Sequence, residues 1–243
     1  MPLMSLLQAA KRRWKWLLVI VPVVAVVVVV GGTFVYIHFI APDPAPKLAF
    51  ADPATASSSA DPGDPALTAA GAIDGTWKVT SGSKVQYRVQ ETLNGQANEA
   101  TGSDVAVTGQ LTFGGTTVSA ASFSVDMTQF GSSEDTRDDQ FQNRIMDTSD
   151  YPTATFELMS PIVLAAIPDN LTQITAHVTG TLTMHGKSQQ VTFDLLARRN
   201  GAHLEVNGTI PITFSDYGIR NPSGGPASVG NTGDLEFLLI FTK

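Results

Sequence analysis

The side chains best suited to catalysis or metal binding are few in this sequence and lie far apart along the chain. There is no cysteine, so neither a thiolate metal site nor a cysteine nucleophile can form. The four histidines are His38, His177, His185 and His203. None of them stands in the H-x-H or H-x-x-E spacing that would bring metal ligands or members of a catalytic triad together. The sequence therefore predicts a protein that is not an enzyme, with no catalytic residues and no metal site.

A dense group of ionisable side chains lies in a short segment that looks helical. Thr136 is the expected N-cap of this helix, and Asp139 three residues later completes a variant of the capping box. Phe141 and Ile145 then lie four residues apart on one helical face. The helix is expected to end before Pro152, because the residue before a proline disfavours helical backbone. A single short helix inserted among strands is a natural lid or plug.

Strands must position this helix, because alternation of apolar and polar residues dominates the chain from Ile73 onward. The alternation is clearest in residues 85–90, 123–127 and 174–184. Asn200-Gly201 separates two such runs and predicts a hairpin with a type I′ turn. About eight strands at this spacing predict an all-β fold, either a barrel or a sandwich.

The N-terminal part of the chain predicts a membrane anchor. Residues 16–37 form a nearly continuous apolar run, long enough to span a bilayer, and four basic residues precede it. Because basic residues stay on the cytoplasmic side, we expect residues 1–15 inside, a single-pass transmembrane helix at 16–40 in the plasma (inner) membrane, and the C-terminal part outside. The alternative is a cleaved signal peptide, with release of a secreted protein after cleavage near Ala51.

Composition separates a linker from a folded domain. Residues 41–71 consist mainly of Ala, Pro, Asp, Ser and Gly and are expected to form a semi-extended linker, and residues 72–243 an extracytoplasmic domain. The chain after the apolar run carries 11 basic and 22 acidic residues, a net charge of 11 − 22 = −11. Such an acidic exterior argues against nucleic acid as a partner.

Several motifs of the predicted domain resemble those of the YceI family, lipocalin-like proteins of the bacterial envelope that bind polyisoprenoid lipids. They lie in residues 77–87, 107–113, 136–156 and 178–187. The resemblance implies a lipocalin-like antiparallel β-barrel of about eight strands with one short inserted helix. It also implies non-enzymatic binding, sequestration or transport of a polyisoprenoid lipid or isoprenoid quinone inside the barrel, with no other cofactor.

This resemblance and the strand pattern together indicate where a lipid would lie. The expected tunnel residues are Phe113, Phe123, Val125, Phe141, Phe156, Leu182, Phe193 and Phe214. The expected headgroup residues, at the mouth near the helix, are Arg137, Asp138, Gln140, Arg144 and Tyr151. Gln140 replaces the histidine of the family motif, so no titratable imidazole is available there.

A second hypothesis remains open from the residues alone. Each tunnel residue could be ordinary core, and the acids of the helix could simply complement its dipole. The protein would then be an envelope stress or interaction protein with a filled barrel and an acidic protein-binding rim. We name no protein partner and allow for a homodimer.

Overall fold

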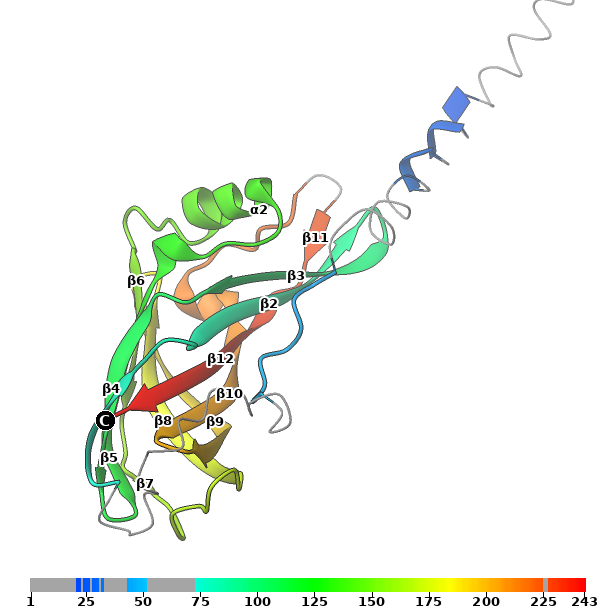
Figure 1. The fold of residues 1–243 in the computed structure, drawn as a ribbon. Coiled ribbons are helices and arrows are strands. Elements are labelled where there is room, and N and C mark those ends of the chain that lie inside the picture. Colours follow the sequence, from blue (N-terminus) through cyan, green and yellow to red (C-terminus); the bar gives the residue numbers. More distant parts are fainter. Residues whose placement is uncertain are drawn as a thin grey trace, which may run out of the picture. The chain divides into compact units, whose positions relative to one another are not determined.

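The computed structural model describes residues 21–22, 24–26, 28–30, 32, 43–51, 73–224 and 227–243 (Figure 1). The chain divides into two compact units. The larger comprises residues 44–90, 99–222 and 229–243, and the smaller comprises residues 1–43, 91–98 and 223–228.

The N-terminal predictions are tested only in small part. The described residues between 21 and 32 are helical. Within the described part of the chain, no helix is both long and apolar enough to cross a membrane. The predicted cytoplasmic segment 1–15 and most of the predicted span 16–40 lie outside the described residues, as does the linker beyond Ala51.

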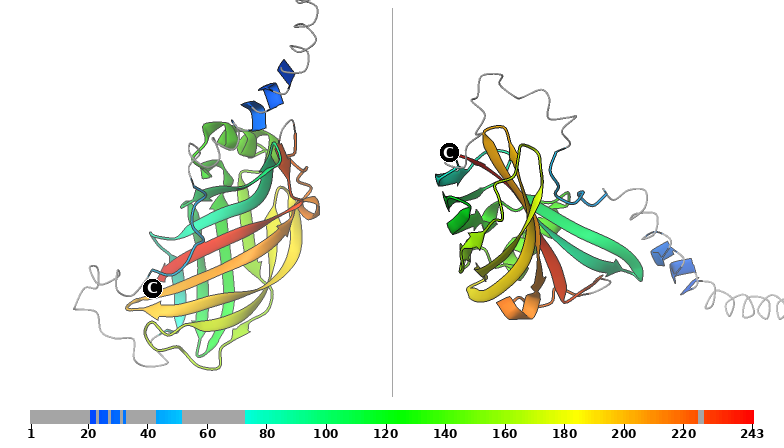
Figure 2. Two further views of the ribbon diagram at one scale, coloured as in Figure 1. Left: turned by 90° about the vertical axis from the view of Figure 1, so that its right-hand side faces the viewer. Right: turned by 90° about the horizontal axis from the view of Figure 1, so that it is seen from below.

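Eight antiparallel strands close into a barrel, in which each strand pairs with the next and the last pairs with the first (Figure 2). In their order around the barrel they are β1 (Gly75–Val79), β4 (Val107–Gly114), β5 (Thr117–Asp126), β6 (Thr153–Leu158), β8 (Ile174–Met184), β9 (Lys187–Asn200), β10 (His203–Thr213) and β12 (Thr232–Thr242). The prediction of an all-β antiparallel barrel of about eight strands is confirmed.

Four shorter or peripheral strands complete the sheet. Strand β2 (Lys84–Leu93) pairs with the first half of β12, while β1 pairs with its C-terminal end. Strand β3 (Gln96–Asp104) pairs with β2, and β7 (Ile162–Val163) pairs with β5. The fourth is β11 (Ala227–Val229). Strand β12 is thus covered along one edge by two successive strands, which closes the barrel.

The alternation seen in the sequence places one set of side chains inside the barrel. In β8, Ala176, Val178 and Leu182 are buried, whereas Thr175 and His177, on either side of Ala176, are exposed. Gly180 also faces inward, and the close approach of a neighbouring ring explains why this residue is glycine. A Cβ at this position would lie 2.2 Å from the Phe156 ring, closer than real contacts allow.

The predicted hairpin at Asn200 is present, but its turn is not type I′. Asn200 pairs with His203, so the two-residue loop is Gly201-Ala202. Of these only Gly201 has a positive φ, +58°, whereas a type I′ turn needs two such residues. A glycine at the first central position is the pattern of type II′. The prediction was wrong because it placed Asn200 in the loop, although that residue ends the strand.

The inserted helix is confirmed, and its predicted cap is wrong. Helix α2 (Asp135–Gln140) has Glu134 as its N-cap, without a capping bond from the side chain, and it continues into a π-helical turn, Phe141–Ile145. Thr136 therefore lies within the helix. Its start is held instead by Asp138, whose Oδ2 accepts a hydrogen bond from the backbone N–H of Ser132 at 3.0 Å.

Helix α2 and its π-helical turn lie at one end of the barrel, and β7 with the connection to β8 lies at the other (Figure 1). At the α2 end, the buried Phe141 ring stacks on Tyr87, with ring centroids 5.0 Å apart, and packs against Phe130 at 5.3 Å. This aromatic cluster packs the helical segment against β2 at the α2 end of the barrel.

Candidate functional site

The barrel encloses a cavity of about 180 Å³. One water molecule needs only about 10–15 Å³ on the same measure, so the space is roughly ten times what a single water requires. Its walls come from inward-facing residues of the barrel strands and are apolar almost throughout. Of the predicted tunnel residues, Phe113, Phe123, Val125, Phe156, Leu182 and Phe193 line the cavity, and Phe141 and Phe214 do not.

A chain of aromatic rings runs across the interior. The Phe156 ring lies 6.3 Å from Phe123 and 5.8 Å from Phe193, between centroids. Phe237 continues the series 5.8 Å beyond Phe193. These rings all line the cavity and give it an apolar wall, which favours hydrocarbon over a polar solute.

The five predicted headgroup residues lie at the α2 end, and none of them lines the cavity. Arg137 and Asp138 are half-buried, while Gln140 is exposed. The exposed Arg144 donates a hydrogen bond to the carbonyl of Pro222 at 2.7 Å, and the Tyr151 ring packs on His185 with centroids 4.7 Å apart. Their role in binding a headgroup stays a prediction.

Three charged residues lie at the opposite end of the cavity. Arg198 and Arg199 lie near the end of β9, and Glu205 lies on the neighbouring β10; all three are among the residues that line the cavity. Arg198 Nε donates to Glu205 Oε2 at 2.6 Å, and Asn200 Nδ2 donates to Glu205 Oε1 at 2.8 Å. Arg199 Nε is buried and has no hydrogen-bond partner among the described residues. The sequence analysis missed this end, although Arg199 continues the alternation of the inward-facing residues of β9.

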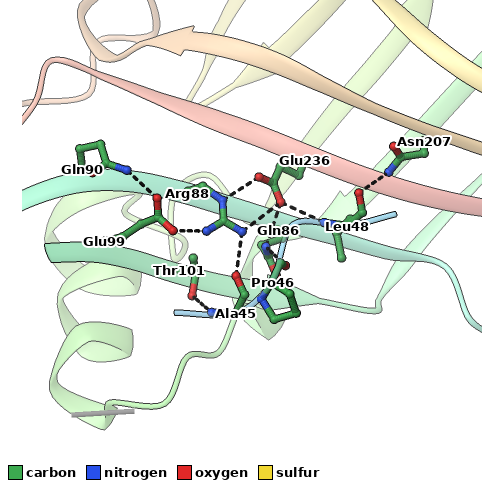
Figure 3. Close-up of polar contacts among 10 residues, drawn as sticks. All are labelled: Ala45, Pro46, Leu48, Gln86, Arg88, Gln90, Glu99, Thr101, Asn207 and Glu236. Carbon is green, nitrogen blue, oxygen red and sulfur yellow. Dashed lines mark hydrogen bonds and ion pairs between the residues drawn. The ribbon is translucent and has the colours of Figure 1, made fainter. Parts of the chain in front are cut away.

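A segment that the sequence assigned to the linker lies against the barrel (Figure 3). We call residues 44–51 the strap. Its backbone is held at Ala45, whose N–H donates to Thr101 Oγ1 at 3.0 Å and whose carbonyl accepts from Arg88 at 2.8 Å. The Leu48 carbonyl accepts a hydrogen bond from Asn207 Nδ2 at 2.8 Å, and its N–H donates to Glu236 Oε2 at 3.3 Å.

The C-terminal end of the strap is fixed by Arg198. The guanidinium donates to the carbonyl of Ala51 at 2.9 Å, and the Phe50 ring stacks over its Cζ at 4.5 Å from the ring centroid. Arg198 is only 3% exposed. Its charge is therefore satisfied by Glu205 on one side and by the strap on the other.

Beneath the strap lies a buried ionic cluster. Arg88 Nε donates to Glu236 Oε1 at 2.7 Å, and the same guanidinium pairs with Glu99. The hydrogen bond with Glu236 raises the pKa of Arg88 above its ordinary value, while burial acts in the opposite direction. Gln86 Nε2 donates both to Glu236 and to the carbonyl of Pro46, which ties the cluster to the strap.

Two of the described histidines, His177 and His185, contact neighbouring groups of the barrel. His177 and Asp194 form an exposed pair, with Nδ1 and Oδ1 2.7 Å apart. His185 Nδ1 donates to the carbonyl of Tyr217 at 3.0 Å, and burial raises the pKa of Tyr217 to about 12. In the described ranges no three His, Cys, Asp or Glu side chains gather where they could hold a metal ion.

Comparison with known proteins gives the same architecture. A solved structure of BcnA from Burkholderia cenocepacia is 24% identical, with a TM-score of 0.53 over 67% of this chain and 98% of that one. A polyisoprenoid binding domain from Saccharophagus degradans, implicated in plant cell wall breakdown, is 17% identical, with a TM-score of 0.55 over 69% of this chain and 98% of that one. No curated protein matches the chain.

The two structures show the fold, and the match to a family model is more specific. The model of the YceI-like domain matches residues 77–241, which runs from the first barrel strand to the last. The chain therefore belongs to the YceI family.

Proposed function

We propose that this protein binds an elongated isoprenoid lipid, a polyisoprenoid or an isoprenoid quinone, inside its barrel without catalysing a reaction. The observation that carries the proposal is the apolar cavity of about 180 Å³. Each CH₂-sized group that moves from water into such a space gains about 0.8 kcal/mol. A long hydrocarbon chain is thus the ligand that this interior favours most.

Two further observations support the proposal. The chain belongs to the YceI family, and one similar structure is that of a polyisoprenoid binding domain. The alternative of a filled barrel acting through its acidic rim requires a packed interior, and the cavity argues against it. We further propose that residues 16–40 anchor the protein in the plasma membrane, which would keep the barrel close to a source of lipid.

The direct test is to purify the full chain in a detergent that contains no isoprenoid, extract it with organic solvent and analyse the extract by mass spectrometry. We expect an isoprenoid lipid in near-stoichiometric amount. Repeated recovery of lipid-free protein that also fails to take up added isoprenoid would contradict the proposal.

Filling the cavity is expected to abolish binding without unfolding the barrel. Ala176 is buried and lines the cavity, so in an Ala176→Phe variant a ring would occupy the space of the lipid. We expect retained isoprenoid to fall at least about tenfold, measured by the same extraction, with a loss of stability of about 1–3 kcal/mol.

The matched control for this variant is Thr175→Phe. Thr175 precedes Ala176 on β8 and is exposed, so the same ring would lie outside the barrel. This variant should retain lipid as the wild type does. Equal retention by Ala176→Phe and Thr175→Phe would show that the lipid lies elsewhere.

A further inference from the structure

We propose that residues 158–168, which we call the tip segment, contact a lipid bilayer and form the entrance through which a lipid tail passes into the cavity. This inference rests on the proposed lipid-binding function and adds to it the surface that meets the source of the lipid.

The tip segment has a composition that a connection between strands does not need. It comprises the end of β6, strand β7 and the start of the connection to β8. Between Glu157 and Asp169 the chain has no charged residue, and Ser160 is the only residue there with a polar side chain. Surface connections normally consist of polar residues, glycine and proline. An apolar run at the surface marks a site of contact with a membrane or with another protein.

Apolar side chains of the tip segment are exposed at the end of the barrel opposite α2 (Figure 1). Val163 is 74% exposed and Met159 is 54% exposed. Ala165 and Ala166 are exposed as well. Each of these side chains would gain free energy on leaving water for hydrocarbon. The tip segment thus presents an apolar surface that the described part of the chain leaves uncovered.

The other side of the tip segment is part of the cavity wall. Ile162, Leu164 and Ile167 line the cavity and are half-buried. The exposed Val163 and Ala165 alternate with them along the chain. The same short segment therefore reaches the cavity on one side and solvent on the other. A hydrocarbon tail that passed it would stay in apolar surroundings from the outside to the interior.

The backbone of the tip segment is held by few bonds to the barrel. Strand β7 pairs with β5 at two positions, and the N–H of Leu164 donates to the carbonyl of Thr116 at 2.9 Å. Residues 165–168 lie outside any helix or strand. Strand β8, by contrast, pairs with β9 along its whole length. Because segments with fewer backbone bonds open at lower free energy, the tip segment can move aside while the barrel stays closed.

Charge favours this end over the α2 end for contact with a bilayer. Residues 134–139, at the start of α2, include four acids and one arginine. Anionic lipids repel such a surface, whereas the uncharged tip segment can approach them without this cost. A protein partner would account for the exposed apolar side chains but not for their continuity with the cavity. We therefore assign a lipid bilayer as the partner of the tip segment.

Fluorescence quenching tests the contact with the bilayer. Because the chain has no cysteine, Val163→Cys can carry a single fluorophore. The labelled full chain is mixed with an excess of phosphatidylcholine vesicles whose acyl chains are brominated, so that only a fluorophore within the bilayer is quenched. We expect the fluorescence at position 163 to fall at least about twofold.

The matched control for this label is Val105→Cys. Val105 is 72% exposed, almost as much as Val163, and lies in the connection between β3 and β4. Its fluorescence should stay unchanged. Absence of quenching at position 163, with isoprenoid still retained by the protein, would overturn the bilayer contact and leave the lipid-binding function standing. Equal quenching at both positions would overturn the assignment of the contact to the tip segment.

A charge at the tip segment tests the entrance. The full chain, freed of lipid, is mixed with vesicles that contain geranylgeraniol. At increasing times the vesicles are dissolved in detergent, the protein is captured through an affinity tag, and its isoprenoid is extracted and measured. In Val163→Asp we expect uptake to be slowed at least about fivefold, because a carboxylate enters the bilayer at high cost. The final amount bound should equal that of the wild type.

Val105→Asp is the control for this variant and should take up the isoprenoid at the wild-type rate. Both substitutions lie at exposed positions, so the urea midpoint should stay unchanged in each. Equal rates in Val163→Asp and Val105→Asp would overturn the entrance. Dimerisation of the wild type that is lost in Val163→Asp, without quenching by vesicles, would replace the bilayer by a second copy of the chain. A wild type that takes up no isoprenoid would overturn the lipid-binding function itself.

Discussion

Replacing Trp77 with alanine is expected to lower the free energy of unfolding by about 3–5 kcal/mol, a large part of the 5–15 kcal/mol typical of a domain. Trp77 lies in the middle of β1 and is 0% exposed. Its indole Nε1 donates a hydrogen bond to the carbonyl of Ile73 at 2.7 Å. The substitution leaves a cavity in the core and also removes the partner of that carbonyl. Urea unfolding followed by circular dichroism measures the loss.

Two variants separate the causes of this effect. Trp77→Phe keeps one aromatic ring but loses the rest of the indole together with the hydrogen bond, so it should cost less than the alanine substitution, about 1–3 kcal/mol. Lys78→Ala changes the next, exposed residue of the same strand and should remain within about 0.5 kcal/mol of the wild type. A Trp77→Ala variant as stable as Lys78→Ala would mean that β1 does not anchor the core.

Replacing Arg88 with methionine is expected to cost a similar amount, about 3–5 kcal/mol, for an electrostatic reason. Arg88 is 6% exposed and Glu236 is 2% exposed, and the substitution leaves that carboxylate buried without its cationic partner. Glu99 is less buried and can turn to solvent at lower cost. The loss should appear as a lower urea midpoint with an unchanged slope.

The double variant Arg88→Met with Glu236→Leu is the control. Removing both charges leaves no fully buried carboxylate without its partner, since Glu99 can turn to solvent, so the double variant should be more stable than Arg88→Met alone. A double variant with a lower free energy of unfolding than Arg88→Met alone would show that Glu236 contributes to stability independently of Arg88.

The sequence predicted the barrel because strand alternation is a local property. Inward-facing residues of β8 such as Val178 and Leu182 can be recognised from the two-residue alternation of the strand. The same alternation in β9 reaches Arg199 near the end of that strand. The headgroup prediction instead followed the charged helix near Arg137, and that role stays a prediction. The residues of this helix do not line the cavity, because they belong to an insertion between strands and not to the alternating pattern of a barrel strand.

The strap could not be predicted by any local pattern. Its composition is that of a linker, and its partners Arg88, Arg198 and Glu236 lie far apart in the sequence. Each of them alone looks like an ordinary polar residue of a barrel strand. They form one binding surface only once the strands are placed next to one another, which sequence spacing does not reveal.

The strap also affects how the proline-rich region, residues 41–71, is attached to the barrel. Ala51 is bound by Arg198, and Ile73 is buried and bound by Trp77, so both ends of the intervening residues are attached to the same barrel. An insertion between these two attachment points would lengthen a segment whose two ends are already fixed, and doubling its length would cost only about 0.6 kcal/mol of closure entropy. For the proposed anchor at residues 16–40, such an insertion would leave the number of residues between the anchor and the strap unchanged.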